Sequence, residues 1–349
     1  MKTGFNFATF FKEKLKCDLI KIEQITGGRN SQIFKVEDSK GGKFAAKIYY
    51  INAADHRDRL DTEFNALNFL WSNNIKNIPE PIVAEPTNDF AIYEYIDGCS
   101  PLLLKISLQD IDQACEFLIN LNKLRTNIDS EKISSASEAV FSINSLNEDL
   151  KHRYNRLMAL TEKSERLLEC QNFLSKNLYP FYKKLLIWSK DKLLAAGISI
   201  EKMLTKAERV LSPSDFGFHN AIRRPDGELI FLDFEYFGWD DPAKMISDFV
   251  LHPGMNLRPE LKRRFIDKML ETFDIKGNLR VRLSALFPLF GIKWCFILLN
   301  EFIPADMARR DFSGNSSNNH EKRKIKQLNK AKKMLKEVAT NYEQFYNFD

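Results

Sequence analysis

Short runs of alternating apolar and polar residues dominate the first hundred positions of the chain. Runs at 21–25, 31–37 and 43–50 alternate with a period of two, which is typical of β-strands with one buried face. Two further apolar runs, at 82–85 and 89–96, end beside turn residues and predict two more strands. Turns that contain glycine separate the first three runs. The pattern therefore predicts a β-sheet at the start of the chain.

A helical pattern follows the third of these strands. Apolar residues recur at helical spacing over 55–71 and predict an amphipathic helix. Glu63 lies at the apolar edge of this helix, where a carboxylate needs a partner. The order of the elements makes Lys47, on the third strand, the candidate. We therefore expect an ion pair between Lys47 and Glu63.

The remainder of the chain has a mainly helical pattern. Residues 105–205 contain few helix breakers, and apolar helices are expected at 245–251 and 283–302. The last of these is interrupted by a proline, a glycine and polar residues, so it predicts a buried helix or helix pair rather than a membrane span. A polar loop at 313–319 leads into a basic terminal helix.

One interruption of the helical pattern contains the residues that suggest chemistry. Asp215 stands five residues before Asn220, and Asp233 follows after residues 221–232, which read as a β-hairpin around a Pro-Asp-Gly turn at 225–227. Such a hairpin returns Asp233 to the neighbourhood of Asn220. Kinase-type phosphoryl transfer needs a carboxylate at the attacking hydroxyl, and an asparagine and another carboxylate for Mg²⁺. The spacing and the turn both favour that arrangement.

The predicted strands could hold the nucleotide that such a transfer requires. Glycines let the backbone approach a phosphate, and polar side chains beside them could donate to its oxygens. A strand lysine could neutralise the α- and β-phosphates, and backbone groups at the end of the fifth strand could face the adenine ring. The expected nucleotide-binding residues are Gly27, Gly28, Asn30, Ser31, Lys47, Glu94, Tyr95 and Ile96.

These motifs, taken in order, resemble those of the aminoglycoside phosphotransferase and choline kinase superfamily, small-molecule relatives of protein kinases. The resemblance implies an α+β, protein-kinase-like fold with two lobes. It places an antiparallel sheet and a helix in a nucleotide-binding lobe at 1–97, and a mostly helical catalytic lobe at 98–349. The motifs are TGGRNS at 26–31, Lys47, Glu63, YEYIDG at 93–98, Asp215 to Asn220, and DFE at 233–235.

The same resemblance implies the reaction and the roles of its residues. ATP or GTP would donate a phosphoryl group to a hydroxyl of a small molecule, with Mg²⁺ as the metal. Asp215 would be the catalytic aspartate, and Asn220 and Asp233 the metal ligands. Lys47 and Glu63 would position the phosphates.

The chain departs from the superfamily at one position. Many members have histidine two residues before the catalytic aspartate, and Pro213 stands there instead. Because proline fixes its own φ, it could make this loop more rigid. A catalytically inactive nucleotide-binding scaffold is the alternative interpretation. A protein kinase is disfavoured, because the chain lacks H-R-D, D-F-G and A-P-E sequences at the expected places.

The distribution of charge argues against a nucleic-acid partner. The net charge of the chain is +5, but residues 321–337 alone contain eight Lys or Arg and two Glu, so the rest is close to neutral. This segment has an apolar stripe and no aromatic platform for bases. A terminal helix packed on the second lobe is the favoured interpretation, and contact with a membrane surface is the alternative.

Cysteine usage predicts a cytoplasmic protein. The five cysteines are scattered, odd in number and without C-x-x-C spacing, so neither a disulfide framework nor a zinc site is expected. The first residues (MKTGF) lead into charged positions, so no signal peptide is expected.

The sequence leaves the acceptor open between an amino alcohol such as choline or ethanolamine, a sugar and an aminoglycoside. An aromatic cage for a quaternary ammonium would need residues such as Trp294, although core packing is the simpler role for that residue. Glu235 could face the acceptor or support Asp233. Asp248, in an apolar helix, is better explained as an anchor of the catalytic loop. An acid-lined pocket for a polycation could draw on Asp240, Asp241, Asp248, Glu301 and Asp306.

Overall fold

The computed structural model describes residues 7–25, 30–52, 55, 57–274, 277–315 and 320–344. Its first part is an antiparallel sheet of five strands in the order β1-β2-β3-β5-β4. All five predicted strands are present. The period-two pattern fixes their faces, since alternate side chains of a strand point to opposite sides. The strands are β1 Leu19–Ile25, β2 Ser31–Asp38, β3 Lys43–Tyr49, β4 Pro81–Glu85 and β5 Phe90–Glu94.

A different helix covers each face of the sheet. Ala46 and Ile48 of β3 join a small aromatic core with the short N-terminal helix α1 (Phe7–Phe10). Tyr49, on the opposite face, joins the main core together with helix α2 (Arg59–Ser72). The helix predicted over 55–71 therefore begins four residues later than expected. The reason is local, because Asp58 accepts a hydrogen bond from the Asp61 N–H and caps the helix there.

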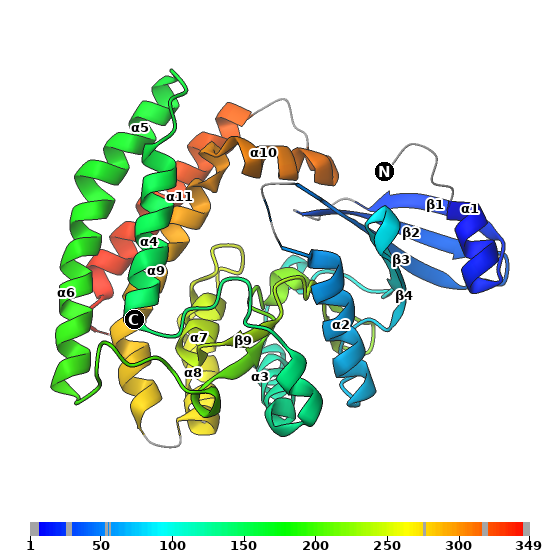
Figure 1. The fold of residues 1–349 in the computed structure, drawn as a ribbon, viewed down its shortest axis with the longest axis horizontal. Coiled ribbons are helices and arrows are strands. Elements are labelled where there is room, and N and C mark those ends of the chain that lie inside the picture. The colour runs from blue at the N-terminus through cyan, green and yellow to red at the C-terminus, as the bar shows by residue number, and fades with distance from the viewer. Residues whose placement is uncertain are drawn as a thin grey trace.

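The second part of the molecule is mostly helical and lies beside the sheet (Figure 1). Its central element is α9 (Asn278–Leu299), a single continuous helix, although a helix pair was the other possibility. Its helices are α3 Leu108–Lys123, α4 Ile143–Met158, α5 Glu165–Phe173, α6 Tyr179–Ala195, α7 Pro242–Leu251, α8 Pro259–Phe273, α9 Asn278–Leu299, α10 Pro304–Arg310 and α11 His320–Asn341.

Helix α9 is the one described helix that is long and apolar enough to cross a membrane. The segment Asn278–Phe302 meets that criterion, but 78% of its apolar window is buried inside the protein. Helices α4, α6, α7 and α11 pack around it. This environment is typical of the core helix of a globular fold.

Two small antiparallel sheets frame the segment that contains Asp215. Strand β6 (Val210–Ser212) pairs with β9 (Gly238–Asp240), and β7 (Ala221–Arg223) pairs with β8 (Leu229–Phe231). The second pair is the predicted hairpin. Its turn closes through the Gly227 N–H, which donates to the Arg224 carbonyl oxygen at 3.0 Å.

The basic terminal helix α11 packs on α9, as the favoured interpretation predicted. Leu328, Ala331 and Leu335 are buried in the main core. The apolar stripe of the described part of α11 is thus covered by protein and does not face outward. Several of its cations pair with carboxylates of the same protein, including Lys332 with Glu169 at 2.7 Å.

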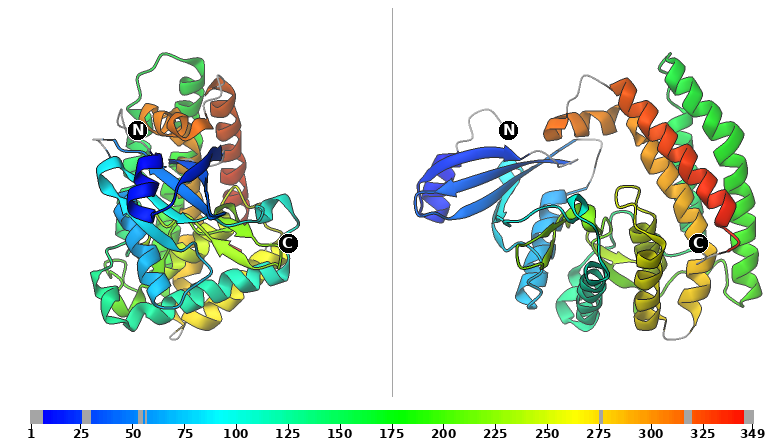
Figure 2. Two further views of the ribbon diagram at one scale, coloured as in Figure 1. Left: turned by 90° about the vertical axis from the view of Figure 1, so that its right-hand side faces the viewer. Right: turned by 180° about the vertical axis from the view of Figure 1, so that it is seen from behind.

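The end of α10 brings a late segment of the chain back to the sheet, as the two views in Figure 2 show. The Gln32 side-chain amide donates to the Phe312 carbonyl oxygen at 2.8 Å, and the rings of Tyr50 and Phe312 lie 5.2 Å apart. The division of the chain at residue 97 stays a prediction. Strand β5 ends at Glu94, shortly before that position.

Candidate active site

The loop after β6 presents Asp215 with its carboxylate one-third exposed. Ser214 adopts a left-handed backbone conformation (φ +68°), which turns the chain sharply between Pro213 and Asp215. The Asn220 side-chain amide then donates to the Asp215 carbonyl oxygen at 2.9 Å. The loop is therefore closed on itself, and it holds Asp215 and Asn220 side by side.

Two stacked histidines lie against the Asp215 carboxylate. The His219 Nε2 atom lies 3.0 Å from the Asp215 Oδ1 atom, and the His252 Nε2 atom lies 3.9 Å from it. The two imidazole rings stack with their centroids 3.7 Å apart, and His252 also meets Trp294 edge to face. The side-chain atoms of Asp215, His219 and His252 that could coordinate a metal ion all lie within 4.8 Å of one another. Sequence reasoning missed this pair, although His219 directly precedes Asn220.

The hairpin returns Asp233 to Asn220, as its turn predicted. The Leu232 N–H donates to the Asn220 carbonyl oxygen at 2.8 Å, immediately after the last residue of β8. Asp233 itself has a left-handed backbone (φ +66°). This conformation is uncommon for aspartate and turns its side chain out of the direction of the strand.

Lys47 joins the sheet to the hairpin. Its ammonium lies 2.6 Å from Oε2 of Glu63 and 2.7 Å from Oδ1 of Asp233, so the expected ion pair with Glu63 is present. Lys47 is only 7% exposed. Burial alone would lower the pKa of Lys47, but the charges of Asp233 and Glu63 hold it well above its ordinary value.

Further hydrogen bonds hold the Glu63 carboxylate in place. The Tyr49 hydroxyl donates to Oε2 of Glu63 at 2.6 Å, and the Phe234 N–H donates to Oε1 at 3.2 Å. Tyr49 also shares a hydrogen bond of 2.7 Å with the hydroxyl of Tyr93. The alternation of β3 could have revealed Tyr49, because it lies two residues after Lys47 and hence on the same face.

Glu235 is buried behind Asp233. Its Oε1 atom accepts a hydrogen bond from the Asn30 side-chain amide and lies 3.7 Å from Nε of Arg59. Burial, followed by the negative charge of Asp233, raises the pKa of Glu235 to about 7. Asn30 and Tyr236 also share a hydrogen bond of 3.1 Å, so this cluster joins the start of β2 to the D-F-E segment.

A buried lysine, Lys244, supports the loop that contains Asp215. The Lys244 ammonium donates to the Ser214 hydroxyl at 2.9 Å and to Oδ2 of Asp240 at 2.7 Å. It also lies 3.2 Å from Asp248, which is held by Lys293 at 2.9 Å. Asp248 thus has the anchoring position expected for it.

The structure locates the other expected nucleotide-binding residues less directly. Gly27 and Gly28 lie outside the described residues. The Asn30 amide points to Glu235, and Ser31 is buried. The Glu94 N–H donates to the Glu80 carbonyl oxygen at 2.9 Å, so this donor is used within the protein. The adenine contact of the other backbone groups of Glu94, Tyr95 and Ile96 stays a prediction.

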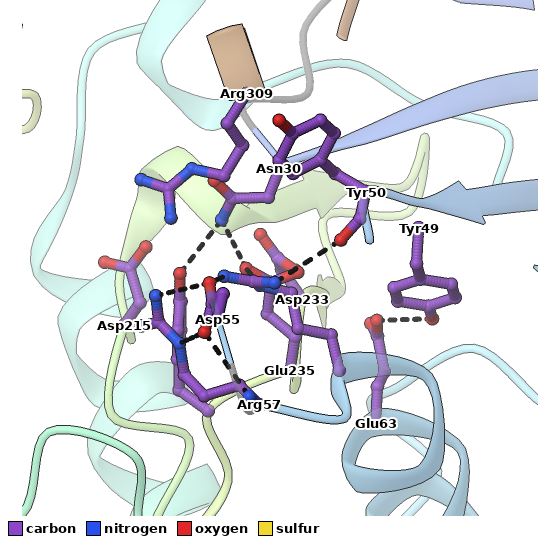
Figure 3. A network of polar contacts seen from close by, with 12 residues as sticks. Asn30, Tyr49, Tyr50, Asp55, Arg57, Glu63, Asp215, Asp233, Glu235 and Arg309 are labelled. Carbon is purple, nitrogen blue, oxygen red and sulfur yellow. Dashed lines mark hydrogen bonds and ion pairs between the residues drawn. The ribbon is translucent and has the colours of Figure 1, made fainter. Parts of the chain in front are cut away.

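Arg309 is a residue of this region that no sequence pattern indicated. Figure 3 shows it reaching down from α10 toward the space above Asp215 and Glu235. Its Nη2 atom donates to Oδ1 of Asp306 at 2.9 Å. Because α10 takes its place through packing of the helical part, only the folded chain brings Arg309 here.

The donor atoms beside Asp215 suit Mg²⁺, which prefers oxygen ligands. The Asn220 Nδ2 group is used within the loop, which leaves its Oδ1 atom as the available ligand. The Asp233 carboxylate is 30% exposed and uses Oδ1 for Lys47. These two residues, both expected as ligands, therefore fit the ion.

Neither a family model nor a curated protein matches the sequence. Solved structures match its fold. A spectinomycin phosphotransferase in complex with ADP and spectinomycin aligns over 97% of this chain and 98% of its own, with a TM-score of 0.66 and 14% identity. An ethanolamine kinase from Plasmodium vivax aligns over 92% and 83%, with a TM-score of 0.57 and 15% identity. A choline kinase from Streptococcus pneumoniae aligns over 94% and 98%, with a TM-score of 0.56 and 14% identity.

The chain has the kinase-like α+β fold of aminoglycoside phosphotransferases and choline or ethanolamine kinases. The predicted fold class is therefore confirmed. Two independent features agree with this likeness. The sheet order places Lys47 on a central strand, and the hairpin brings Asp233 to it.

Proposed function

We propose that this protein transfers the γ-phosphoryl group of ATP or GTP to a hydroxyl of a small molecule. The observation that carries the proposal is a continuous series of contacts: Lys47 pairs with Asp233, the residue before Asp233 bonds to Asn220, and Asn220 bonds to Asp215. Phosphoryl transfer needs positioning and charge stabilisation more than covalent chemistry by the protein. The cluster supplies both kinds of group.

The roles divide between the two sides of this cluster. Asp215 orients and deprotonates the attacking hydroxyl, and His219 holds its carboxylate at 3.0 Å. Lys47, held by Glu63, neutralises the nucleotide phosphates. Asn220 and Asp233 would hold Mg²⁺, which when bound would neutralise the negative charge of the phosphates.

The surroundings favour an acceptor that is not a polycation. Each of the five carboxylates considered for an acid-lined pocket is paired with a cation of the protein itself, so none is left to bind an ammonium. Trp294 is 7% exposed and donates to Asp248, so it does not form a cage wall. A neutral or anionic alcohol, such as a sugar, fits better. The pairs are Asp240–Lys244, Asp241–Arg282, Asp248–Lys293, Glu301–Arg323 and Asp306–Arg156.

The test is nucleotide consumption by the purified protein with Mg²⁺. Choline, ethanolamine, neutral sugars, sugar acids and aminoglycosides are offered as separate sets, with ATP and with GTP. Asp215→Asn should lower turnover by about 10²–10⁴-fold. Asp129→Asn, a change of an exposed carboxylate, serves as the matched control.

Three results would contradict the proposal. Protein that neither binds nor consumes either nucleotide is not a phosphotransferase. Binding without consumption, unchanged in Asp215→Asn, would establish the inactive scaffold instead. Preferred phosphorylation of an aminoglycoside or of choline would overturn the choice of acceptor alone.

A further inference from the structure

A cavity lies in the helical part, apart from the candidate active site. Its volume is about 690 Å³, which is within the range of small-molecule sites. It lies between α3, β6, the start of α9 and the segment around 202–208. Its apolar wall includes Ile119, Leu204, Val210 and Leu279. None of Lys47, Glu63, Asp215, Asn220 and Asp233 lines it.

A buried guanidinium with an unused donor forms part of the cavity wall. Arg282 is 7% exposed and lines the cavity. It pairs with Asp241 through Nη2, whereas its Nε has no hydrogen-bond partner among the described residues. An arginine has five N–H donors in a fixed plane, and a buried donor without an acceptor is costly. The Nε atom itself is shielded from solvent, so the wall offers a buried positive charge rather than an open donor.

The charges around the cavity are predominantly positive, and its carboxylates are already used. Glu208 lies 2.6 Å from the Lys202 ammonium and accepts from the Thr205 N–H at 2.9 Å. Asp274 accepts from the Leu279 N–H at 2.8 Å, at the start of α9. Lys202 and Arg282 are themselves paired, with Glu208 and Asp241, so the excess of positive charge at the cavity comes from Lys123 and Arg125. The cations are Lys123, Arg125, Lys202 and Arg282, and the acids are Glu208 and Asp274.

One wall residue clamps the strand that leads to Asp215. The Leu211 N–H donates to Oδ1 of Asn122 at 2.9 Å, and Nδ2 of Asn122 donates to the Leu211 carbonyl oxygen at 3.2 Å. Leu211 belongs to β6, which runs directly into the catalytic loop. A ligand against Asn122 therefore touches a support of that loop.

A second series of contacts connects the cavity to the same loop, and it begins at Arg282. Asp241, the partner of Arg282, donates its N–H to Oδ1 of Asp240 at 2.9 Å. Asp240 pairs with Lys244, which donates to the Ser214 hydroxyl beside Asp215. These contacts form a continuous buried chain from the cavity wall to the loop.

We propose that this cavity binds a small organic anion, with its carboxylate or phosphate on Arg282 and its apolar body against Leu204 and Val210. The occupant acts on the catalytic loop through Asn122 and Asp241. The binding half of this inference stands without the proposed function, and only the regulatory half rests on it.

Phenyl phosphate, benzoate and the neutral benzyl alcohol are suitable probes of the cavity. Their binding is measured by thermal unfolding and by nuclear magnetic resonance titration.

Removing Arg282 would leave Asp241 buried and unpaired, so a substitution that fills the cavity is the better variant. Ile119→Trp adds bulk inside the cavity and changes no charge. Glu116→Trp, on the exposed side of the same helix, is the matched control.

An anion at tenfold excess over its Kd should raise the melting temperature of wild type and Glu116→Trp by about 2–4 °C. Ile119→Trp should abolish this rise, and benzyl alcohol should produce none. Lys47→Met should leave the rise intact, because that residue belongs to the other site. The proposal is overturned if neither anion binds up to about 10 mM. It is also overturned if Ile119→Trp still responds, or if Lys47→Met removes the response.

Turnover provides the readout for the regulatory half. Phenyl phosphate should change the turnover of wild type at least about twofold, which corresponds to a small coupling between the sites. Ile119→Trp should keep its own turnover unchanged by the probe. The regulatory half of the proposal is overturned if phenyl phosphate changes the turnover of both proteins equally, or if it leaves the turnover of wild type unchanged. A chain without any phosphotransferase activity would fail the earlier assay while the binding result still stands.

Discussion

The ammonium of Lys47 lies 2.7 Å from the Oδ1 atom of Asp233, although 186 residues separate the two in the chain. The same ammonium lies 2.6 Å from Glu63, on the helix that packs against the sheet. One cation thus holds the strand β3, the helix α2 and the hairpin at a single point. The pair of Lys47 with Glu63 is buried, so its electrostatic energy is little screened by water.

Lys47→Met should therefore lower both activity and stability. Loss of the ammonium removes one stabiliser of the phosphate charge, for which we expect a loss of about 10²–10³-fold in kcat. It also leaves the carboxylate of Glu63 buried without its cation, which costs about 3–5 kcal/mol in unfolding free energy. Kinetics at a temperature where the variant is folded, together with urea unfolding, measure the two effects separately.

Lys43→Met is the matched control for that change. Lys43 lies on the same strand and pairs with Asp97 at 3.0 Å, but its side chain is 43% exposed. Such a surface pair contributes about 0–1 kcal/mol. Equal effects of the two variants would show that the buried position of Lys47 has no special role.

His219 should act as a positioning residue for Asp215. His219→Ala removes the contact of 3.0 Å to the Asp215 carboxylate and should lower kcat about tenfold to a hundredfold, with KM nearly unchanged. His219→Gln keeps an N–H group near the position of Nε2 and should restore most of the rate. His152→Ala, an exposed change on α4, should leave kcat as it was.

A merely structural role of His219 predicts a different result. In that case Gln would not restore the rate, and His219→Ala would lower kcat only as far as it lowers the fraction of folded protein. The pH profile of kcat would also keep its shape. Measuring the profile for all three proteins separates these possibilities.

The sequence predicted those parts of the site that local patterns encode. The strands follow from period-two alternation, and the approach of Asp233 to Asn220 follows from the turn at 225–227. The ion pair of Lys47 and Glu63 was expected because a carboxylate at an apolar helix edge needs a cation.

The rest depends on tertiary packing that no local pattern encodes. Lys244 reads as an ordinary helix lysine, yet it is buried between Asp240 and Asp248. Arg309 reaches the site only because α10 packs back toward the sheet. The contact of His219 with Asp215 depends on the left-handed turn at Ser214. A serine in the sequence does not predict that conformation, which is uncommon for residues other than glycine.

The packing of the terminal helix on α9 depends on a glycine that can be tested. A Cβ atom at Gly291 would lie 2.5 Å from Cγ2 of Val338, which is far inside van der Waals contact. Gly291→Ala should therefore destabilise the protein by about 1–3 kcal/mol through overpacking. This loss outweighs the gain of roughly 1 kcal/mol that alanine brings to a helix interior.

A second substitution identifies the cause. In a Val338→Ala background the clash is absent, so the same Gly291→Ala change should be neutral or stabilising. Urea unfolding of the wild type, both single variants and the double variant gives the coupling energy. Additive effects would mean that α11 does not pack on Gly291 as described.

Asp112 links α3 to α8 and should make stability depend on acid pH. Its carboxylate lies 2.7 Å from two nitrogens of Arg264 and 2.8 Å from the Lys268 ammonium. The hydrogen bonds from Arg264, more than those from Lys268, lower the pKa of Asp112 to about 2. In an unfolded chain the pKa of aspartate is about 3.9. Because the folded value is the lower one, the stabilisation is complete above the unfolded pKa and is lost as the pH falls toward 2.

Asp112→Asn should accordingly be less stable than wild type at pH 7. The difference should be about 1 kcal/mol or less, because the carboxylate is one-third exposed and water screens the pair. It should shrink as the pH falls from about 4 to about 2, where the wild-type carboxylate takes up its proton. Glu116→Gln, one turn further along α3, controls for the loss of an exposed charge. A difference between Asp112→Asn and wild type that stayed constant over this range would mean that the ion pair does not contribute to stability.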